Sequence, residues 1–199
     1  MFNTFLIALY VSCDLIANVT ASKPVTVFGF TAPAGVFIYA ATFTLVDLIN
    51  ERLGKKGARH VVYAAFAANI LLAAYTLLVV HLPSPDFYTH QTAFAATLGS
   101  TPRIVVASLV AFIVSSLIDV EIFAWWKEKI GRHKWARVLT SNTVSTFVDS
   151  VVFVGIAFAG VLPLVSLIAG QYVMKMGITI VSIPLIYLVR RQAATARND

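Results

Sequence analysis

Six long runs of apolar residues alternate with short polar connections along the chain. Each run has close to the ~20 residues with which an α-helix crosses a hydrocarbon core of ~30 Å. Lipid cannot hydrogen-bond to the backbone, so helices are the structure that such runs favour. The predicted membrane-spanning helices lie at about 2–20, 28–50, 60–81, 103–126, 138–161 and 164–189. We therefore expect an all-α integral membrane protein, a six-helix bundle with residues 1–199 in a single transmembrane domain.

The overall composition agrees with a chain that is embedded in lipid. Of the 199 residues, 59% are hydrophobic and 12% are charged, and the mean hydropathy is +0.84. Soluble domains are roughly half apolar and a quarter charged. The single cysteine, Cys13, excludes an intrachain disulfide and a cysteine-based zinc site, and we predict neither a metal site nor a cofactor. The first run lacks a basic leader and contains Asp14, so we interpret it as a retained helix rather than a signal peptide.

Most basic residues lie in the polar segments between or after the apolar runs. Twelve of the fifteen are in 51–60, 127–137 and the tail after 189. The positive-inside rule places such segments in the cytoplasm, so both termini are expected there. The connections expected outside are near 21–27, 82–102 and 162–163. Because topology explains most of the cations, the net charge of +6 indicates a membrane-lipid environment and no nucleic-acid partner.

The longest connection is the segment 82–102. It opens with a Pro-Ser-Pro breaker and continues with a short, mildly apolar stretch. Two interpretations are open for it. It folds over the outer face as a lid, or it is an ordinary interfacial loop in which Phe87 and Tyr88 belong to the aromatic belt.

Ionisable side chains within the apolar runs are the first candidates for a functional site. A charged group at the bilayer centre costs at least ~2.5 kcal/mol, so it requires a partner or a function. With a rise of ~1.5 Å per residue, Asp149 and Lys175 both lie near mid-membrane and can meet. Two interpretations stay open: the residues pair and join two helices, or they form walls of a polar cavity.

Polar residues at helical spacing extend this candidate site. Asn142 lies on the helix face of Asp149, and Gln171 lies one turn before Lys175. Asp14 and Asn18 are likewise one turn apart in the first run. The predicted substrate-binding residues are Asp14, Asn18, Asn142, Asp149, Gln171 and Lys175.

Carboxylates near the cytoplasmic ends of the helices have a simpler interpretation. They can reach water or pair with basic residues of the adjacent loops, which makes direct contact with a substrate unnecessary. We therefore expect a gating or structural role for Asp47, Glu51, Asp119 and Arg137.

The chemistry of the candidate site suits a small planar heteroaromatic molecule with a donor–acceptor edge. A carboxylate accepts hydrogen bonds from paired ring N–H groups, and an amide or ammonium group answers a carbonyl oxygen. Tyr10, Tyr39 and Phe43 are candidates for stacking, although such rings more often pack within the bundle. The sequence motifs GxSxG and HExxH are absent, so we do not expect an enzyme.

Four groups of motifs follow one another along the chain: "AN…PVTVFGF…AGVF…TFTLVDL…ERLG", "TPRIVVASLVAF…IDVEIF", "SNTVSTFVDSVVF" and "QYVMK…IPLIY". In combination, and over nearly the whole chain, they resemble the queuosine precursor transporter family, also called the putative vitamin uptake transporter family. The resemblance implies a six-helix protein of the bacterial inner membrane, similar in architecture to the substrate-binding subunits of energy-coupling-factor vitamin transporters. It also implies import of 7-cyano-7-deazaguanine or 7-aminomethyl-7-deazaguanine for tRNA modification.

The family pattern falls on Asn18, Asp47, Asp119, Asp149 and Lys175. Gln171 stands where the family can have an acid, so we hypothesise that this chain prefers the neutral cyano ring to the cationic aminomethyl ring. The alternative function is that of a substrate-binding subunit of an energy-coupling-factor transporter for another vitamin or nucleobase-like ligand. The energy source, homo-oligomerisation and an energising partner subunit are left open by the sequence.

Overall fold

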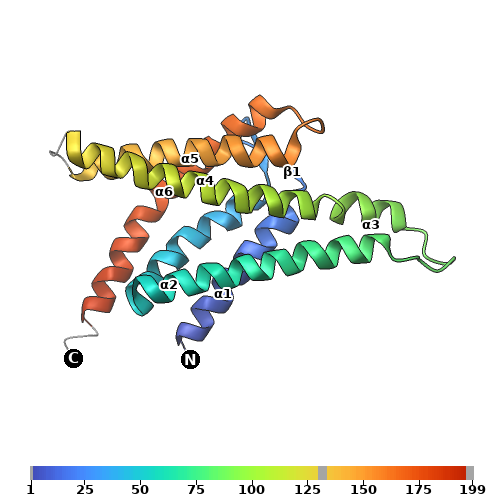
Figure 1. Cartoon of the computed structure of the whole chain (residues 1–199), viewed down its shortest axis with the longest axis horizontal. Coiled ribbons are helices and arrows are strands. Elements are labelled where there is room, and N and C mark those ends of the chain that lie inside the picture. Colours follow the sequence, from blue (N-terminus) through green and yellow to red (C-terminus); the bar gives the residue numbers. More distant parts are fainter. Residues whose placement is uncertain (1, 130–133, 196–199) are drawn as a thin grey trace.

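The structure is a computed structural model that describes residues 2–129 and 134–195, with side chains for 2–46, 48–118, 121–122 and 142–181. Helices pack into an elongated bundle, with a small hairpin beside it (Figure 1). The elements are α1 (Phe2–Thr20), β1 (Pro24–Val27), β2 (Phe30–Pro33), α2 (Gly35–His81), α3 (Gln91–Leu98), α4 (Thr101–Lys129), α5 (Lys134–Phe158) and α6 (Leu164–Thr195).

Apolar helices make up most of the described chain. Four segments are long and apolar enough to cross a membrane: Phe2–Thr20, Leu48–His81, Gln91–Ile118 and Leu164–Val181. Two shorter apolar helical segments are Gly35–Val46 and Asn142–Phe158. All six apolar runs of the sequence therefore contain helix, and four of the described segments reach spanning length.

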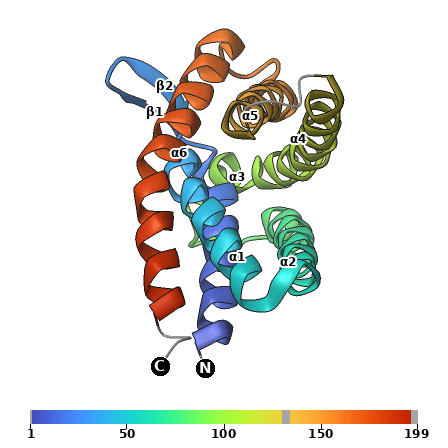
Figure 2. The ribbon, with the colours of Figure 1, turned by 90° about the vertical axis from the view of Figure 1, so that its left-hand side faces the viewer.

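Helix α2 consists of two legs that meet at a sharp bend. Gly54 has φ 69° and ψ 175°, a conformation that only glycine adopts without strain. Helix continues on both sides of this residue, so the expected polar loop at 51–60 is wrong. One glycine replaces the loop, and the two legs fold back along each other (Figures 1 and 2).

A β-hairpin occupies residues that were expected to begin the second helix. Strands β1 and β2 pair antiparallel, from Pro24 opposite Pro33 to Val27 opposite Phe30. The turn residues Phe28 and Gly29 both have positive φ, 50° and 81°, which is the geometry of a two-residue hairpin turn. The prediction of helix over 28–34, and with it the strictly all-α fold, is wrong. β-Branched residues and two prolines favour extended backbone there.

Segment 82–102 contains the short helix α3. The side-chain amide of Gln91 donates a hydrogen bond of 2.9 Å to the carbonyl of Val80, which ties α3 to the end of α2. No residue of α3 is buried. Figure 1 shows α3 at one end of the bundle, beside α2, and none of its residues lines the two cavities described below.

The most extensive packing joins α4 with α5 and α1 with α2. Arg103 of α4 donates hydrogen bonds to the carbonyls of Ile156 (2.6 Å) and Ala159 (2.8 Å), at the end of α5. A guanidinium at this position satisfies carbonyls that a helix C-terminus leaves without partners. Arg103, which lies outside the basic segments, therefore has a structural role.

The two ends of the bundle differ in charge. The start of α1, the bend of α2 and the end of α6 lie toward one end, and the hairpin and α3 toward the other (Figure 1). The bend carries Lys55 and Arg59, and the last turns of α6 contain Arg190 and Arg191. Two of the three basic segments of the sequence therefore share one end, which we call the basic end; the opposite end is the hairpin end.

Candidate functional site

An ion pair between neighbouring helices lies at the centre of the candidate site. The ammonium of Lys175 on α6 donates a hydrogen bond to the carboxylate of Asp149 on α5. The side chains are 6% and 15% exposed, so the pair is largely withdrawn from water. The two residues that the sequence placed at similar depth therefore meet.

Tyr39 of α2 completes this centre. Its ring centroid lies 5.1 Å from the Lys175 ammonium, within the range of a cation–π interaction. The same ring makes an edge contact with Phe43, at 5.4 Å between centroids. Lys175 thus contacts both a carboxylate and an aromatic ring.

A small cavity lies on the hairpin side of the ion pair. Asn18, Pro33, Tyr39, Asp149, Gln171 and Lys175 are among the residues that line it. The cavity leaves about 30 Å³ for the centres of water molecules, which is room for two or so waters. We call it the hairpin-side cavity. Four of the six predicted substrate-binding residues face it.

Gln171 is the least satisfied member of this set. The residue is 2% exposed, and its amide oxygen has no hydrogen-bond partner. A buried acceptor without a partner costs the full desolvation of that group. A ligand donor that reaches this oxygen would offset that cost.

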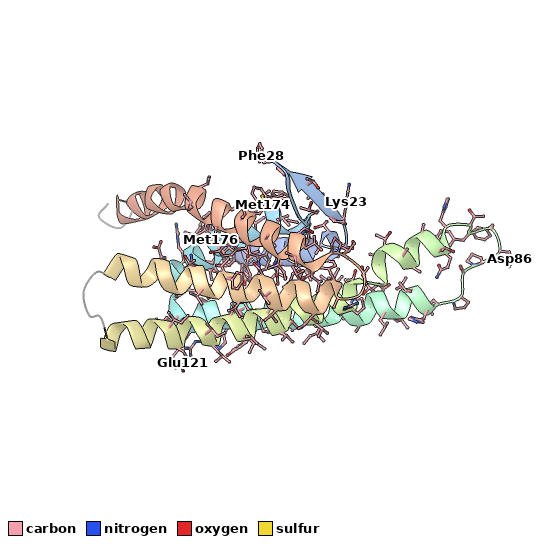
Figure 3. All side chains as sticks on the ribbon, turned by 90° about the horizontal axis from the view of Figure 1, so that it is seen from above. Lys23, Phe28, Asp86, Glu121, Met174 and Met176 are labelled. Atoms are coloured by element: carbon pink, nitrogen blue, oxygen red, sulfur yellow. The ribbon has the colours of Figure 1, made fainter. Side chains whose placement is uncertain are left out.

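Two glycines permit close backbone contacts between the elements beside this cavity. A Cβ on Gly170 would collide with the backbone of Thr31 in β2, and a Cβ on Gly35 would collide with the carbonyl of Ala17 in α1. The hairpin therefore rests directly on α6, and α1 rests on the start of α2. Phe28 points away from the helices at the hairpin tip, and Lys23 lies near its base (Figure 3).

A chain of amides links the two predicted residues of α1 to the second leg of α2. The amide of Asn18 donates to the side-chain oxygen of Asn69, and the amide of Asn69 donates to Asp14, both at 2.6 Å. Asn69 also donates to the carbonyl of Ala65 at 2.9 Å and is completely buried. Asp14 lies in this chain and lines neither of the two cavities beside the ion pair.

Sequence reasoning missed Asn69. Its one signal is a single amide within the apolar run "AANILLAAY". Such an amide requires a buried partner, but the sequence does not say which helix provides it.

A larger cavity lies on the other side of the ion pair. Tyr39, Asp149 and Lys175 line it from one direction, and Asn142, Ser145 and Thr146 of α5 from another. It leaves about 320 Å³ for the centres of water molecules. We call it the middle cavity. Asn142, the fifth predicted residue that lines a cavity, faces this space rather than the hairpin-side cavity.

Four predicted gating or structural residues remain. Glu51 is exposed near the bend of α2. Asp47, Asp119 and Arg137 lie outside the described side chains. Of the three proposed stacking residues, Tyr39 and Phe43 line the middle cavity, while Tyr10 packs in the core between α1 and α2.

The site combines groups that bind a polar planar molecule. It offers a carboxylate acceptor, an ammonium donor, an unpartnered amide oxygen and an aromatic ring among the residues that line one cavity. Among the described residues, no three His, Cys, Asp or Glu side chains gather to hold a metal ion. The geometry therefore fits recognition of an organic ligand by hydrogen bonds and stacking.

Known proteins similar to this chain agree with such a role. Residues 33–189 match the family described as "Putative vitamin uptake transporter". A "Probable queuosine precursor transporter" of Bacillus subtilis (strain 168) is 29% identical over 180 residues, which are 88% of this chain and 79% of that protein. The "Queuosine precursor transporter" of Escherichia coli (strain K12) is 24% identical over 145 residues, 71% of this chain and 62% of that protein.

A third relative is a "Probable queuosine precursor transporter" of Haemophilus influenzae (strain ATCC 51907 / DSM 11121 / KW20 / Rd), 26% identical over 167 residues, which are 79% of this chain and 67% of that protein. No solved structure matches the chain. The family match contains Asp149, Gln171 and Lys175, and the apolar helices fit a multi-pass membrane protein. The chain therefore belongs to the putative vitamin uptake transporter family and is a membrane transporter rather than an enzyme.

Proposed function

We propose that this protein imports a queuosine precursor, 7-cyano-7-deazaguanine or 7-aminomethyl-7-deazaguanine, into the bacterial cytoplasm for tRNA modification. The observation that carries the proposal is the buried Asp149–Lys175 pair beside the unpartnered oxygen of Gln171, in a chain whose relatives are named queuosine precursor transporters. These groups match the edges of a guanine-like ring, which has adjacent N–H donors and a carbonyl oxygen.

In the proposed complex, the carboxylate of Asp149 accepts hydrogen bonds from the N–H edge of the ring. The ring thereby replaces Lys175 as its partner, and the released ammonium donates to the ring carbonyl. Charge-assisted bonds of this kind are stronger than neutral ones. Tyr39 lies beside the ammonium and provides the aromatic face.

Gln171 has a role that the unbound site suggests directly. Its amide oxygen is buried without a partner, and Gln171 is among the residues that line the hairpin-side cavity. We expect a donor of the substrate, such as an exocyclic amine, to reach it. An uncharged amide here favours the neutral cyano ring over the cationic aminomethyl ring.

The proposed topology is six membrane-spanning helices with both termini in the cytoplasm of a bacterium and the basic end facing inward. Support comes from the six apolar helical segments and from the basic residues that share one end of the bundle (Figure 1). The positive-inside rule gives the direction. Substrate then enters at the hairpin end and leaves at the basic end.

Equilibrium binding of 7-cyano-7-deazaguanine to the purified protein in detergent tests the proposal. Guanine and biotin are the comparison ligands, Asp149→Ala is the site variant, and Asp86→Ala, an exposed carboxylate in the connection after α2, is the matched control. We expect binding of the deazaguanine by the wild type and by Asp86→Ala, and loss of binding in Asp149→Ala. Binding of biotin in place of the deazaguanine would overturn the substrate and support a vitamin-binding subunit, as the family name allows.

A further inference from the structure

The hairpin-side cavity and the middle cavity share one wall. Tyr39, Asp149 and Lys175 line both spaces. The ion pair and the ring that contacts its ammonium therefore lie between two chambers, and a molecule that passes from one to the other must pass these three side chains.

The lining residues of α2 and α5 show how the two cavities are arranged along the bundle. On α2, Gly35 lines the hairpin-side cavity and Phe43 the middle cavity, with Tyr39 between them. On the oppositely directed α5, Phe153 lines the first and Asn142 the second, on either side of Asp149. At a rise of ~1.5 Å per residue, the chambers are stacked along the helix axes rather than side by side.

The lining residues of α4 show the same arrangement of the cavities. Ser108 lines the hairpin-side cavity, and Ser115 lines the middle cavity two turns later. A third cavity of about 390 Å³ shares Phe112 and Ser116 with the middle cavity. Lys55 and Arg59 line this third space, which lies at the basic end. Three cavities that share lining residues with their neighbours therefore follow one another from the hairpin side toward the basic end.

We propose that the middle cavity is a second station for the transported heteroaromatic ring, and that the Asp149–Lys175 pair with Tyr39 is a removable partition between the two stations. The proposal rests on the proposed function for the identity of the ligand. The ring opens the partition when it takes the place of Lys175 at the carboxylate.

The lining of the middle cavity fits a transient station. The rings of Tyr39, Phe43 and Phe112 offer faces for stacking. Beyond the shared ion pair, its polar groups are neutral hydroxyls and the amide of Asn142. Neutral partners bind more weakly than charged ones, so a ring that has moved from Asp149 onto these groups is held less firmly and can leave toward the basic end.

The two cavities also differ in size. The hairpin-side cavity leaves about 30 Å³ and the middle cavity about 320 Å³ for the centres of water molecules. A bicyclic ring cannot enter the first chamber without movement of its walls, whereas the second has space for it. The structure therefore has less space at the first station than at the second.

Two matched cysteine variants test the partition without any ligand. Both variants are made in a Cys13→Ser background, so that no native thiol reacts. Ser108→Cys and Ser145→Cys then place a thiol of nearly the same size as the hydroxyl in the hairpin-side and middle cavities. A membrane-impermeant maleimide is applied from the basic-end side of oriented vesicles, and labelling rates are measured.

We expect Ser145→Cys to react and Ser108→Cys to be protected. Adding Lys175→Met should raise the labelling rate of Ser108→Cys at least about tenfold, the factor that corresponds to loss of one charge-assisted hydrogen bond from the closed form. If that chain does not fold, the double change Asp149→Asn with Lys175→Met removes both charges and serves the same purpose. Equal reactivity of the two thiols with the pair intact, or continued protection of Ser108→Cys without it, would overturn the partition.

A ligand arm tests the second station separately. Saturating 7-cyano-7-deazaguanine should slow the labelling of Ser145→Cys in the chain with the pair intact, and an unchanged labelling rate of this thiol would overturn the second station. If the ligand does not bind at all, the proposed function fails, while the labelling rates without ligand still decide whether the ion pair separates two chambers.

Discussion

Gln171 and Lys175 lie one turn apart on α6 and face the same cavity, but their hydrogen bonding differs. Lys175 is paired with Asp149, whereas the buried amide oxygen of Gln171 has no partner. The helix therefore carries one polar group that has a partner within the protein and one that has none. This difference allows stability and binding to be tested at separate residues.

Replacement of Gln171 should affect binding more than stability. Gln171→Leu removes a buried acceptor that has no partner, so the free energy of unfolding should not fall. Binding of 7-cyano-7-deazaguanine should weaken roughly 3- to 10-fold, the effect of one lost hydrogen bond. Titration calorimetry and thermal unfolding of the same samples measure both quantities. A clear loss of stability with unchanged affinity would contradict this role.

Gln171→Glu tests the choice between the two queuosine precursors. A carboxylate next to Lys175 adds a negative charge that favours the cationic aminomethyl ring. The ratio of uptake of the aminomethyl ring to the cyano ring should therefore rise relative to the wild type. If the ratio does not change, Gln171 does not set the preference.

Removing one partner of the ion pair should destabilise the protein more than removing both. Lys175→Met leaves Asp149 as a buried charge without its partner, and we expect a loss of about 3–5 kcal/mol in the free energy of unfolding. Adding Asp149→Asn removes the charge and should restore much of this stability. Thermal unfolding in detergent measures both variants. The double variant should still fail to bind the deazaguanine, which separates folding from recognition.

Asn69→Leu should weaken the contact between α1 and α2. The change removes the bonds to Asn18, Asp14 and Ala65 and leaves their groups buried without that partner. We expect a loss of about 1–3 kcal/mol in the free energy of unfolding. Thr97→Val is the control, because this exposed hydroxyl bonds within its own helix α3. Equal stability of the two variants would show that the buried chain contributes little.

Two glycines of α6 provide a matched test of the hairpin contact. Gly170→Ala introduces a Cβ against the backbone of Thr31, whereas a Cβ at Gly177 meets nothing within 4 Å. We expect Gly170→Ala to cost roughly 1–3 kcal/mol, as overpacking does. Gly177→Ala should be neutral or stabilising, since alanine favours helix by about 0.8–1 kcal/mol. Thermal unfolding separates the two variants, and weaker ligand binding by Gly170→Ala would link the hairpin to the site.

The sequence predicted the helices well because apolar runs of this length have few other structures in lipid. The prediction failed where a few residues determine the backbone conformation. The ten residues of the hairpin are too short to break the apolar pattern, although Gly29 and the β-branched residues around it mark a turn between strands. At Gly54 a single positive φ reverses the chain, and polar composition alone did not separate this bend from a loop.

The central pair of the site was predictable for an energetic reason. Asp149 and Lys175 are both costly in lipid and lie at similar depth, so their meeting followed from helix geometry. The partners of Asp14 and Asn18 did not follow, because one sequence does not say which helix faces adjoin. The position of Asn142 in a different chamber was hidden for the same reason: a shared helix face does not reveal where a cavity is divided.

Two sets of side-chain hydrogen bonds cross-link helices in pairs. Asn69 fixes the rotation of α1 against α2, and Arg103 fixes α4 against the end of α5, so each pair of helices is cross-linked within itself. The middle cavity lies where these pairs face each other. A rocking motion of one pair against the other would therefore leave both cross-links intact, while the chambers between them change shape. The proposed route of the substrate then crosses the boundary at which we expect this relative movement.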